Sequence, residues 1–173
     1  MREMVIRTQQ SFSSSASTVW SLICNSRMAD ESPLLFKLGI PQPVECRVPD
    51  GHGGVGSDRE CVSDQGVVHQ RILEWAPEKR LSFRMEWTNM RFQRYVSEIL
   101  DTFDLVATNE GVGVTRTTQV WAKGRFQFLK RFVLFLCLKQ VHRYVFRNWR
   151  RLANLGTPSP NLLESGSSSV PTH

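Results

Sequence analysis

The side chains that could carry acid–base or anion-binding chemistry in this sequence are few and widely separated. His69 lies in a run typical of a β-strand, and His142 lies in a long helical pattern. Glu98 and Asp101 occupy opposite faces of one strand pattern, so at most one of them points inward. Arg116 alternates with apolar residues and would need an anionic partner if its face were buried. We take His69, Glu98 and Arg116 as the candidate catalytic residues, although strand register decides which of them face the interior.

The sequence has no motif for a metal, a cofactor or a hydrolytic triad. No histidine has a second ligand at the spacings that zinc sites use, and no G-x-S-x-G nucleophile motif occurs. We therefore expect no metal and no cofactor. The N-terminal "MREMVIRTQQ" lacks the apolar core of a signal peptide, so we expect a cytoplasmic protein. In that compartment we expect four reduced thiols, at Cys24, Cys46, Cys61 and Cys137.

The net charge of +6 is concentrated near the C-terminus, where residues 123–155 hold nine basic residues and no acidic one. A solvated helix face is the plain interpretation. An RNA site would need exposed aromatic side chains beside the charge, and the rear half of this segment offers none, so we expect no nucleic acid. The front half, "KGRFQFLKRFVLFLCLK", is typical of a membrane surface or homodimer contact. That contact would use Phe128, Phe132, Phe135 and Leu136.

The first third of the chain predicts one strand and two short helices. "REMVIRTQQSFS" alternates as a strand does, and "SSSASTVWSLICN" predicts a helix capped by Ser15 or Ser17. "ESPLLFKLG" predicts a second helix, with Ser32 as its cap, Pro33 in the first helical position and Gly39 at its end.

The middle of the chain predicts an antiparallel meander. Turn signals such as "PDGHGG", "DQG", "APEK" and "TNEG" separate runs of alternating apolar residues. No helical pattern interrupts these runs, which favours hairpins over parallel crossovers. The predicted strands are Val44–Val48, Val55–Ser63, Gly66–Trp75, Arg80–Thr88, Tyr95–Ala107 and Gly113–Ala122.

The last predicted element is a helix from about residue 126 to residue 155. Its rear half has one apolar face and a basic face opposite, whereas its front half is apolar nearly all round. We expect one domain over residues 1–155 and, from composition, a disordered tail over 156–173. The apolar face comprises Leu134, Cys137, Leu138, Val141, Val145, Trp149, Leu152 and Leu155.

Four stretches carry a resemblance to a known family. They are "SASTVWSLICN", the hairpin run "VGSDRECVSDQGVVHQRILEWAPEKRLSFRMEW" with its "EW-x-P-x-x-R-L" turn, "GVGVTRTTQVWAKG" and "WRRLANLG". With the order of elements, they resemble the START/SRPBCC superfamily, in particular its polyketide cyclase/dehydrase-like branch. The resemblance covers roughly residues 3–155. It implies an α+β helix-grip fold, in which a curved antiparallel sheet of about six to seven strands wraps the last helix, with a hydrophobic cavity between them.

The resemblance gives the large apolar strand residues two interpretations: they fill an ordinary core, or they wall a cavity. For a cavity, we expect the lining to include Phe83, Met85, Trp87, Phe103, Trp121, Leu134 and Leu138. The first functional hypothesis is binding of a hydrophobic small molecule, such as a lipid or polyketide. The alternatives are a cyclase/dehydrase-type enzyme using the same cavity, and a peripheral membrane or partner-binding module using the last helix.

Overall fold

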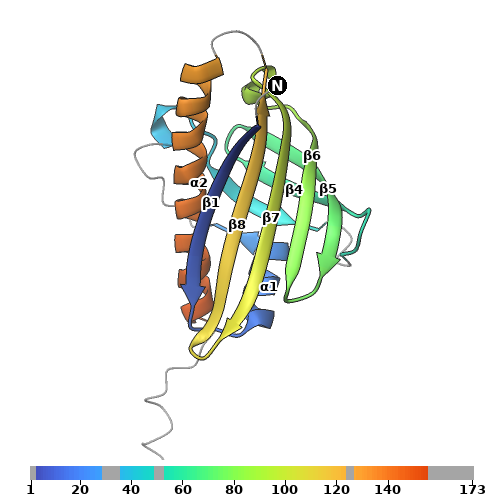
Figure 1. The fold of residues 1–173 in the computed structure, drawn as a ribbon, viewed down its shortest axis with the longest axis vertical. Helices are drawn as coiled ribbons and strands as arrows, with labels where there is room; N and C mark the ends of the chain where they lie inside the picture. Colours follow the sequence, from blue (N-terminus) through green and yellow to red (C-terminus); the bar gives the residue numbers. More distant parts are fainter. Residues whose placement is uncertain (1–2, 29–35, 49–52, 124–126, 156–173) are drawn as a thin grey trace, which may run out of the picture.

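A computed structural model describes residues 3–28, 36–48, 53–123 and 127–155, and these ranges form a curved antiparallel sheet with a long helix along its inner side (Figure 1). The sheet has eight described strands in the order β1-β8-β7-β6-β5-β4-β3-β2. The strands are β1 (Glu3–Phe12), β2 (Ser26–Arg27), β3 (Pro43–Arg47), β4 (Asp58–Ser63), β5 (Gly66–Ala76), β6 (Arg80–Thr88), β7 (Val96–Thr108) and β8 (Gly111–Ala122). The helices are α1 (Ala16–Cys24) and α2 (Gln127–Leu155), with 3-10 turns η1 (Phe36–Leu38) and η2 (Arg91–Arg94).

The meander predicted from the turn signals is confirmed, because each strand from β3 to β8 pairs antiparallel with the next. β1 then pairs with β8 and leaves its other edge beside α2 (Figure 1). The expected six to seven strands become eight because the two-residue β2 is too short to show a periodic pattern. β4 starts at Asp58 and not at Val55, since Gly56 has a φ of 86° that ends any extended run before it.

The first predicted helix is confirmed as α1, and its cap is Ser15. The Thr18 backbone N–H donates to Ser15 Oγ at 3.2 Å, which satisfies one of the free amides at the helix start. The second predicted helix begins at Ser32 and Pro33, which lie outside the described residues. The described part is only the 3-10 turn η1, and Gly39, with a φ of 94°, ends it as predicted. The predicted tail over residues 156–173 also lies outside the described residues.

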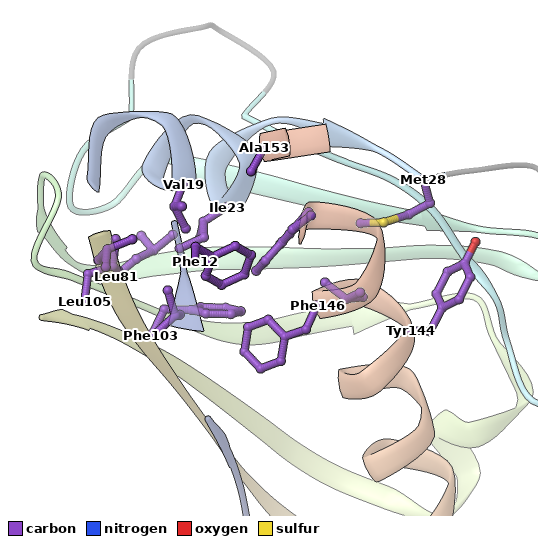
Figure 2. Close-up of a cluster of buried hydrophobic side chains, with 14 of the residues drawn as sticks. Phe12, Val19, Ile23, Met28, Leu81, Phe103, Leu105, Tyr144, Phe146 and Ala153 are labelled. Carbon is purple, nitrogen blue, oxygen red and sulfur yellow. The ribbon is translucent and has the colours of Figure 1, made fainter. Parts of the chain in front are cut away.

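Two apolar clusters fill the space between the sheet and α2. The aromatic cluster lies at the α1 end and is densely buried (Figure 2). Its large members include Phe12, Phe36, Phe83, Phe103, Tyr144, Phe146 and Trp149. The Met85 cluster lies at the opposite end, under the front half of α2. Its buried members are Met4, Ile6, Met85, Val96 and Val120, and the partly buried Val68, Phe92, Ile99, Leu134, Phe135 and Leu138 pack against them.

A β-bulge in β6 breaks the alternation that the sequence predicted. His69 pairs with Trp87 and the next residue, Gln70, pairs with Met85, so Glu86 is an extra residue on β6. The extra residue reverses the faces that follow it. Met85 therefore points inward as expected, but Trp87 points outward and is 48% exposed. The prediction that Trp87 lines the interior is wrong for this reason.

The register of β8, which the sequence left open, places Arg116 on the inner face. Val114, Thr118 and Val120 share that face and are buried. Trp121 lies on the opposite face, where it pairs with Glu98 of β7. The alternative register, in which Trp121 faces inward, is therefore not the one adopted.

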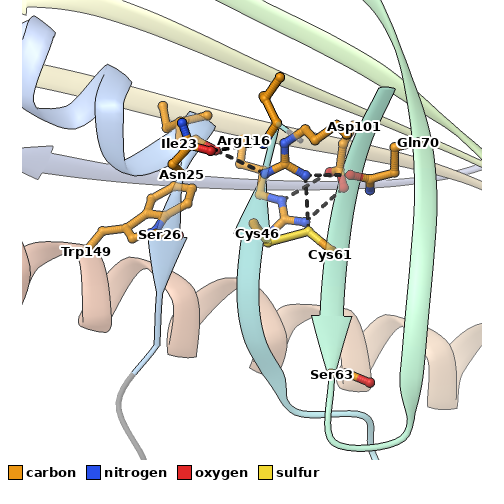
Figure 3. Close-up of a disulfide and its surroundings, with 12 residues drawn as sticks. Ile23, Asn25, Ser26, Cys46, Cys61, Ser63, Gln70, Asp101, Arg116 and Trp149 are labelled. Carbon is orange, nitrogen blue, oxygen red and sulfur yellow. Dashed lines mark hydrogen bonds and ion pairs between the residues drawn. A yellow bond between two sulfur atoms is a disulfide. The ribbon is translucent and has the colours of Figure 1, made fainter. Parts of the chain in front are cut away.

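The expectation of four reduced thiols is wrong for two of them. Cys46 and Cys61 pair directly across β3 and β4, with Cα atoms 4.2 Å apart, and form a disulfide (Figure 3). Residues directly opposite in an antiparallel pair bring their Cβ atoms within disulfide range. A spacing of 15 residues could not reveal that pairing without the strand register. Cys24 and Cys137 are free thiols.

Candidate functional site

A layer of polar side chains separates the two apolar clusters. Its position follows from strand alternation: along β7, Phe103 belongs to the aromatic cluster, Asp101 to the polar layer and Ile99 to the Met85 cluster. The polar layer consists of Thr8, Arg59, Gln70, Asp101, Arg116, Thr118 and His142. Buried polar groups are costly unless they are hydrogen-bonded, so the partners of each group decide what the layer can do.

Asp101 and Arg116 form a two-pronged ion pair inside the layer (Figure 3). Arg116 donates from Nε to Asp101 Oδ1 at 3.1 Å and from a terminal nitrogen to Oδ2 at 2.9 Å. The guanidinium also lies 5.2 Å from the centre of the Phe103 ring. Burial acts to raise the pKa of Asp101, but the charge and hydrogen bonds of Arg116 outweigh it, so the pKa lies below its ordinary value. The predicted need of Arg116 for an anionic partner is met within the chain.

A directed chain of hydrogen bonds joins Asp101 to His142. The Thr118 hydroxyl donates to Asp101 Oδ1, so it can only accept from the ring nitrogen Nε2 of His142, which lies 2.8 Å away. His142 thus carries its proton on Nε2, and Nδ1 accepts from the Thr8 hydroxyl at 3.0 Å. Burial first, and then the charge of Arg116, lower the pKa of His142 to about 3. The imidazole is therefore neutral at pH 7.

The same chain reaches the protein surface at Lys139. Lys139 Nζ lies 3.4 Å from Thr8 Oγ1 and donates to the backbone oxygen of Arg7 at 2.7 Å. Each hydroxyl along the chain donates once and accepts at least once. Because these protons are all engaged, the arrangement orients the side chains and leaves neither ring nitrogen of His142 free to act as a base.

Arg59 is the layer's second guanidinium, and only 2% of the residue is exposed. It donates to Gln70 and to the backbone oxygen of Ile23, lies 3.1 Å from Cys61 Sγ, and sits 4.3 Å from the centre of the Phe83 ring. Its Nε has no hydrogen-bond partner among the described residues. Desolvation lowers the pKa of Arg59 to about 10. Two guanidiniums thus share the single carboxylate of the described layer, which leaves an excess of positive charge.

The three candidate catalytic residues do not form one site. His69 lies on the outer face of the sheet, where it stacks on Trp87 with ring centres 3.9 Å apart. Its Nδ1 lies 3.3 Å from Glu60 Oε1. Glu98 lies on the outer face opposite Trp121, whereas Arg116 lies inside. Strand β6 lies between the strands of His69 and Glu98, and Arg116 lies on the other face of the sheet, so the three cannot act together on one substrate.

The predicted cavity-lining residues divide among three places. Phe83 and Phe103 belong to the densely buried aromatic cluster, where they fill the core. Met85, Leu134 and Leu138 belong to the Met85 cluster. The remaining two, Trp87 and Trp121, lie on the outer face. Among the predicted lining residues that face the interior, only Leu134 and Leu138 of the Met85 cluster are partly buried.

Of the polar layer, sequence reasoning selected Arg116 as a candidate but not Asp101, His142 or Arg59. Asp101 carried a usable signal, because it alternates with Ile99 and Phe103, which face inward. His142 carried a weaker one, because helical spacing places it with Leu138 and Trp149 on the inward face. Arg59 gave no such signal. Its strand is short and consists mostly of polar residues, so no local pattern indicates that Arg59 is buried.

A surface groove opens beside the Met85 cluster. It has a volume of about 660 Å³ and is lined by Gly39, Pro41, Gln65, Asn89, Arg91, Phe92 and Tyr95. Phe92 lines the groove and also packs against the Met85 cluster. The groove therefore borders the Met85 cluster through Phe92, and we call it the mouth groove.

Comparison with known proteins assigns the fold and no family. No family model matches the chain, and no curated protein matches it. Among solved structures, Ara h 8.0201, a Bet v 1-like helix-grip protein, is 13% identical over 90% of this chain and all of its own, with a TM-score of 0.63. Protein NE0264 from Nitrosomonas europaea is 16% identical over 88% of this chain and 95% of its own (TM-score 0.61). A protein of unknown function from Staphylococcus aureus, SA2116, is 9% identical over 89% of this chain and 95% of its own, with a TM-score of 0.62.

These likenesses support the helix-grip fold that the resemblance implied. At identities this low they concern the fold alone, and the polyketide cyclase/dehydrase-like branch stays a prediction. Among the residues that the structure describes, no group of three or more His, Cys, Asp or Glu side chains could hold a metal ion. The function must therefore be argued from the interior and the surface of this chain.

Proposed function

We propose that the chain binds a hydrophobic small molecule in the Met85 cluster, between the sheet and the front half of α2. One observation carries the proposal. Six apolar side chains pack against the cluster and yet remain only partly buried: Val68, Phe92, Ile99, Leu134, Phe135 and Leu138. An apolar side chain that stays partly exposed inside a fold still has surface to offer a ligand. The aromatic cluster also has partly buried apolar neighbours, but the groove that its member Phe146 lines carries five basic residues, which suits a hydrophobic ligand less well.

The mouth groove gives such a ligand an entrance of suitable size and chemistry. Its volume of about 660 Å³ falls within the range of small-molecule sites. Phe92 and Tyr95 offer apolar surface there, and Gln65, Asn89 and Arg91 offer polar groups that could orient a ligand. Met4 and Met85 sit deeper, and unbranched thioether side chains adapt to ligands of different shapes. A lipid or a polyketide fits this combination.

The alternative of a cyclase/dehydrase-type enzyme has weaker support. His69 and Glu98 face outward, and Arg116 is held by Asp101. None of the three candidate catalytic residues therefore faces the Met85 cluster as a free acid or base. A binding role needs no such group.

The test is a titration with Nile red, a neutral dye that brightens in apolar surroundings. We expect saturable binding by the unmodified chain and binding at least ten-fold weaker in the Phe92→Lys variant, because a charge at the groove would have to be desolvated. Phe92 lies on a surface turn, so the folded state should tolerate the change. Val106→Lys, at an exposed site on β7, is the control and should bind as the unmodified chain does. Equal affinity in all three proteins would refute the proposed site.

A further inference from the structure

The outward face of α2 is apolar at its start and cationic over the rest of its length. Phe132, Val133 and Leu136 are 55%, 51% and 51% exposed. At about 100° per residue, Phe132 and Leu136 align with a row of cations further along the helix. That row consists of Lys139, Arg143, Arg147 and Arg150. Phe135, which we expected to join the contact, instead packs inward on the Met85 cluster, and the side chain of Phe128 lies outside the described residues.

The cation row borders a groove between α2 and the edge strand β1. The groove has a volume of about 820 Å³ and is lined by Arg7, Thr8, Gln9, Gln10, Lys139, Arg143, Phe146, Arg147 and Arg150. Five of these residues are basic and none is acidic. We call it the cationic groove. β1 and α2 lie side by side along its length (Figure 1).

Nothing in the local sequence offsets this charge. α2 contains no acidic residue, and like charges spaced four residues apart on a helix, such as Arg143 and Arg147, repel each other. Lys139 is held by the backbone oxygen of Arg7, which fixes one cation at the groove wall. Such a row destabilises its own helix unless an anionic partner balances it.

We propose that this face of α2 docks onto an anionic lipid surface. Phe132, Val133 and Leu136 would enter the interfacial region of the bilayer, and the cationic groove would lie against the headgroup phosphates. From Phe132 to Arg150 the row is about 27 Å long at 1.5 Å per residue. No helix in the described part of the chain is apolar enough over sufficient length to cross a bilayer, so the docking described here is to the surface.

Other partners fit the same face less well. A single-stranded nucleic acid would use several exposed aromatic rings interleaved with the cations. Phe146, the aromatic residue of the cationic groove, is buried, and the exposed Phe132 lies at the end of the row, before its first cation. Nucleic acid would also leave the exposed Phe132, Val133 and Leu136 unused. A second copy of the chain would bring its own cation row to the interface, and the two rows would repel. The combination of apolar and cationic surface favours lipid.

The proposal is independent of the proposed small-molecule function, because docking is measured on vesicles without any added ligand. Sedimentation with phosphatidylcholine vesicles, with and without phosphatidylglycerol, is the direct test. We expect binding only when phosphatidylglycerol is present, and we expect added salt to weaken it. Equal binding to both kinds of vesicle, or none to either, would overturn the proposal.

The charge arm of the test uses the double variant Arg143→Gln/Arg147→Gln. Each cation near an anionic surface raises the affinity for that surface about five-fold. Because the variant removes two cations, we expect it to bind the vesicles about 25-fold more weakly. The matched control, Arg71→Gln/Arg84→Gln, removes the same charge from the outer face of the sheet and should leave binding unchanged. Equal losses in the two double variants would show that net charge alone acts, which would overturn docking by α2.

The apolar arm uses Phe132→Ser/Leu136→Ser against the control Leu73→Ser/Val106→Ser, which alters exposed apolar residues on the sheet. We expect the α2 variant to bind vesicles at least ten-fold more weakly and the control to bind normally. Tighter binding to a single-stranded oligonucleotide than to anionic vesicles would overturn the proposal. So would a dimer, in sedimentation velocity, that Phe132→Ser/Leu136→Ser dissociates.

Discussion

Asp101 is the residue on which the buried polar layer depends. It receives both prongs of Arg116 and the hydroxyl of Thr118, and its charge also acts on the buried guanidinium of Arg59. Buried ion pairs rarely add much stability, but removing one partner leaves an uncompensated charge in a low-dielectric interior. The layer should therefore be far more sensitive to changes at Asp101 than a surface pair is to the loss of one member.

Asp101→Asn should lower the free energy of unfolding by about 3–5 kcal/mol, because Arg116 and Arg59 would stay buried with no carboxylate between them. Urea unfolding monitored by tryptophan fluorescence measures the change. Asp104→Asn, on the same strand, is the control. It removes a partly exposed partner of Arg80 and should cost less than about 1 kcal/mol. Equal losses in the two variants would contradict the role given to Asp101.

The lowered pKa of His142 implies that the stability of the fold depends on pH in a specific way. Its pKa is about 3 in the folded chain against 6.5 for an ordinary histidine, so between these values the unfolded chain binds a proton that the folded chain does not. The contribution is complete above pH 6.5 and is lost as the pH falls toward 3. Its slope is about 1.4 kcal/mol per pH unit.

The His142→Gln variant removes that slope while retaining an amide that can hydrogen-bond to Thr8 and Thr118. Urea unfolding of both proteins at several pH values between 4.5 and 6.5 isolates the difference, since Asp101, whose pKa is lowered, titrates below this window. We expect the unmodified chain to lose stability more steeply on acidification. Parallel curves for the two proteins would mean that His142 is not held neutral.

At the scale of elements, the strands that could be predicted are those with turn-forming residues at both ends. Arg80–Thr88 was predicted with the bounds that the structure gives to β6, because "APEK" and "TNM" mark its ends. The bulge at Glu86 could not be predicted, since an extra residue is invisible until the partner strand is known. That one residue moved Trp87 to the outer face, beside His69.

The disulfide between β3 and β4 predicts two reactive thiols in the denatured chain without reductant, from Cys24 and Cys137, and four after reduction. Reduction should also lower the free energy of unfolding by about 3 kcal/mol, the entropy expected for a closed loop of about 15 residues. A thiol count with Ellman's reagent and urea unfolding with dithiothreitol measure the two effects.

The control for the disulfide is Cys46→Ala, whose stability should no longer respond to dithiothreitol. Four reactive thiols in the denatured, non-reduced chain would contradict the pairing. The spacing of the four cysteines could not have predicted it, because register, and not sequence distance, places Cys46 opposite Cys61.

At the scale of the whole molecule, the helix-grip architecture could be predicted and its interior could not. The predicted order of one strand, two short helices, a meander and a long helix leaves few ways to bury the apolar faces. The interior depends on the register of each strand, which sets whether Arg116 faces in and whether Trp121 faces out. The polar layer joins residues from β1, β4, β5, β7, β8 and α2, so no local pattern could reveal it.

The division of the interior also explains where a ligand could bind. The aromatic cluster packs against α1 and the rear half of α2, and the polar layer borders it at its other end. The Met85 cluster has the mouth groove beside it and side chains that are still partly exposed. The central claim is therefore that this end of the fold holds a hydrophobic molecule.

Native mass spectrometry of the protein purified from cells tests that claim most directly, followed by solvent extraction of any bound molecule. We predict one hydrophobic molecule per chain, released by organic solvent and absent from the Phe92→Lys variant. A mass equal to that of the chain alone, with no uptake from a panel of lipids and polyketides, would contradict the proposed binding function.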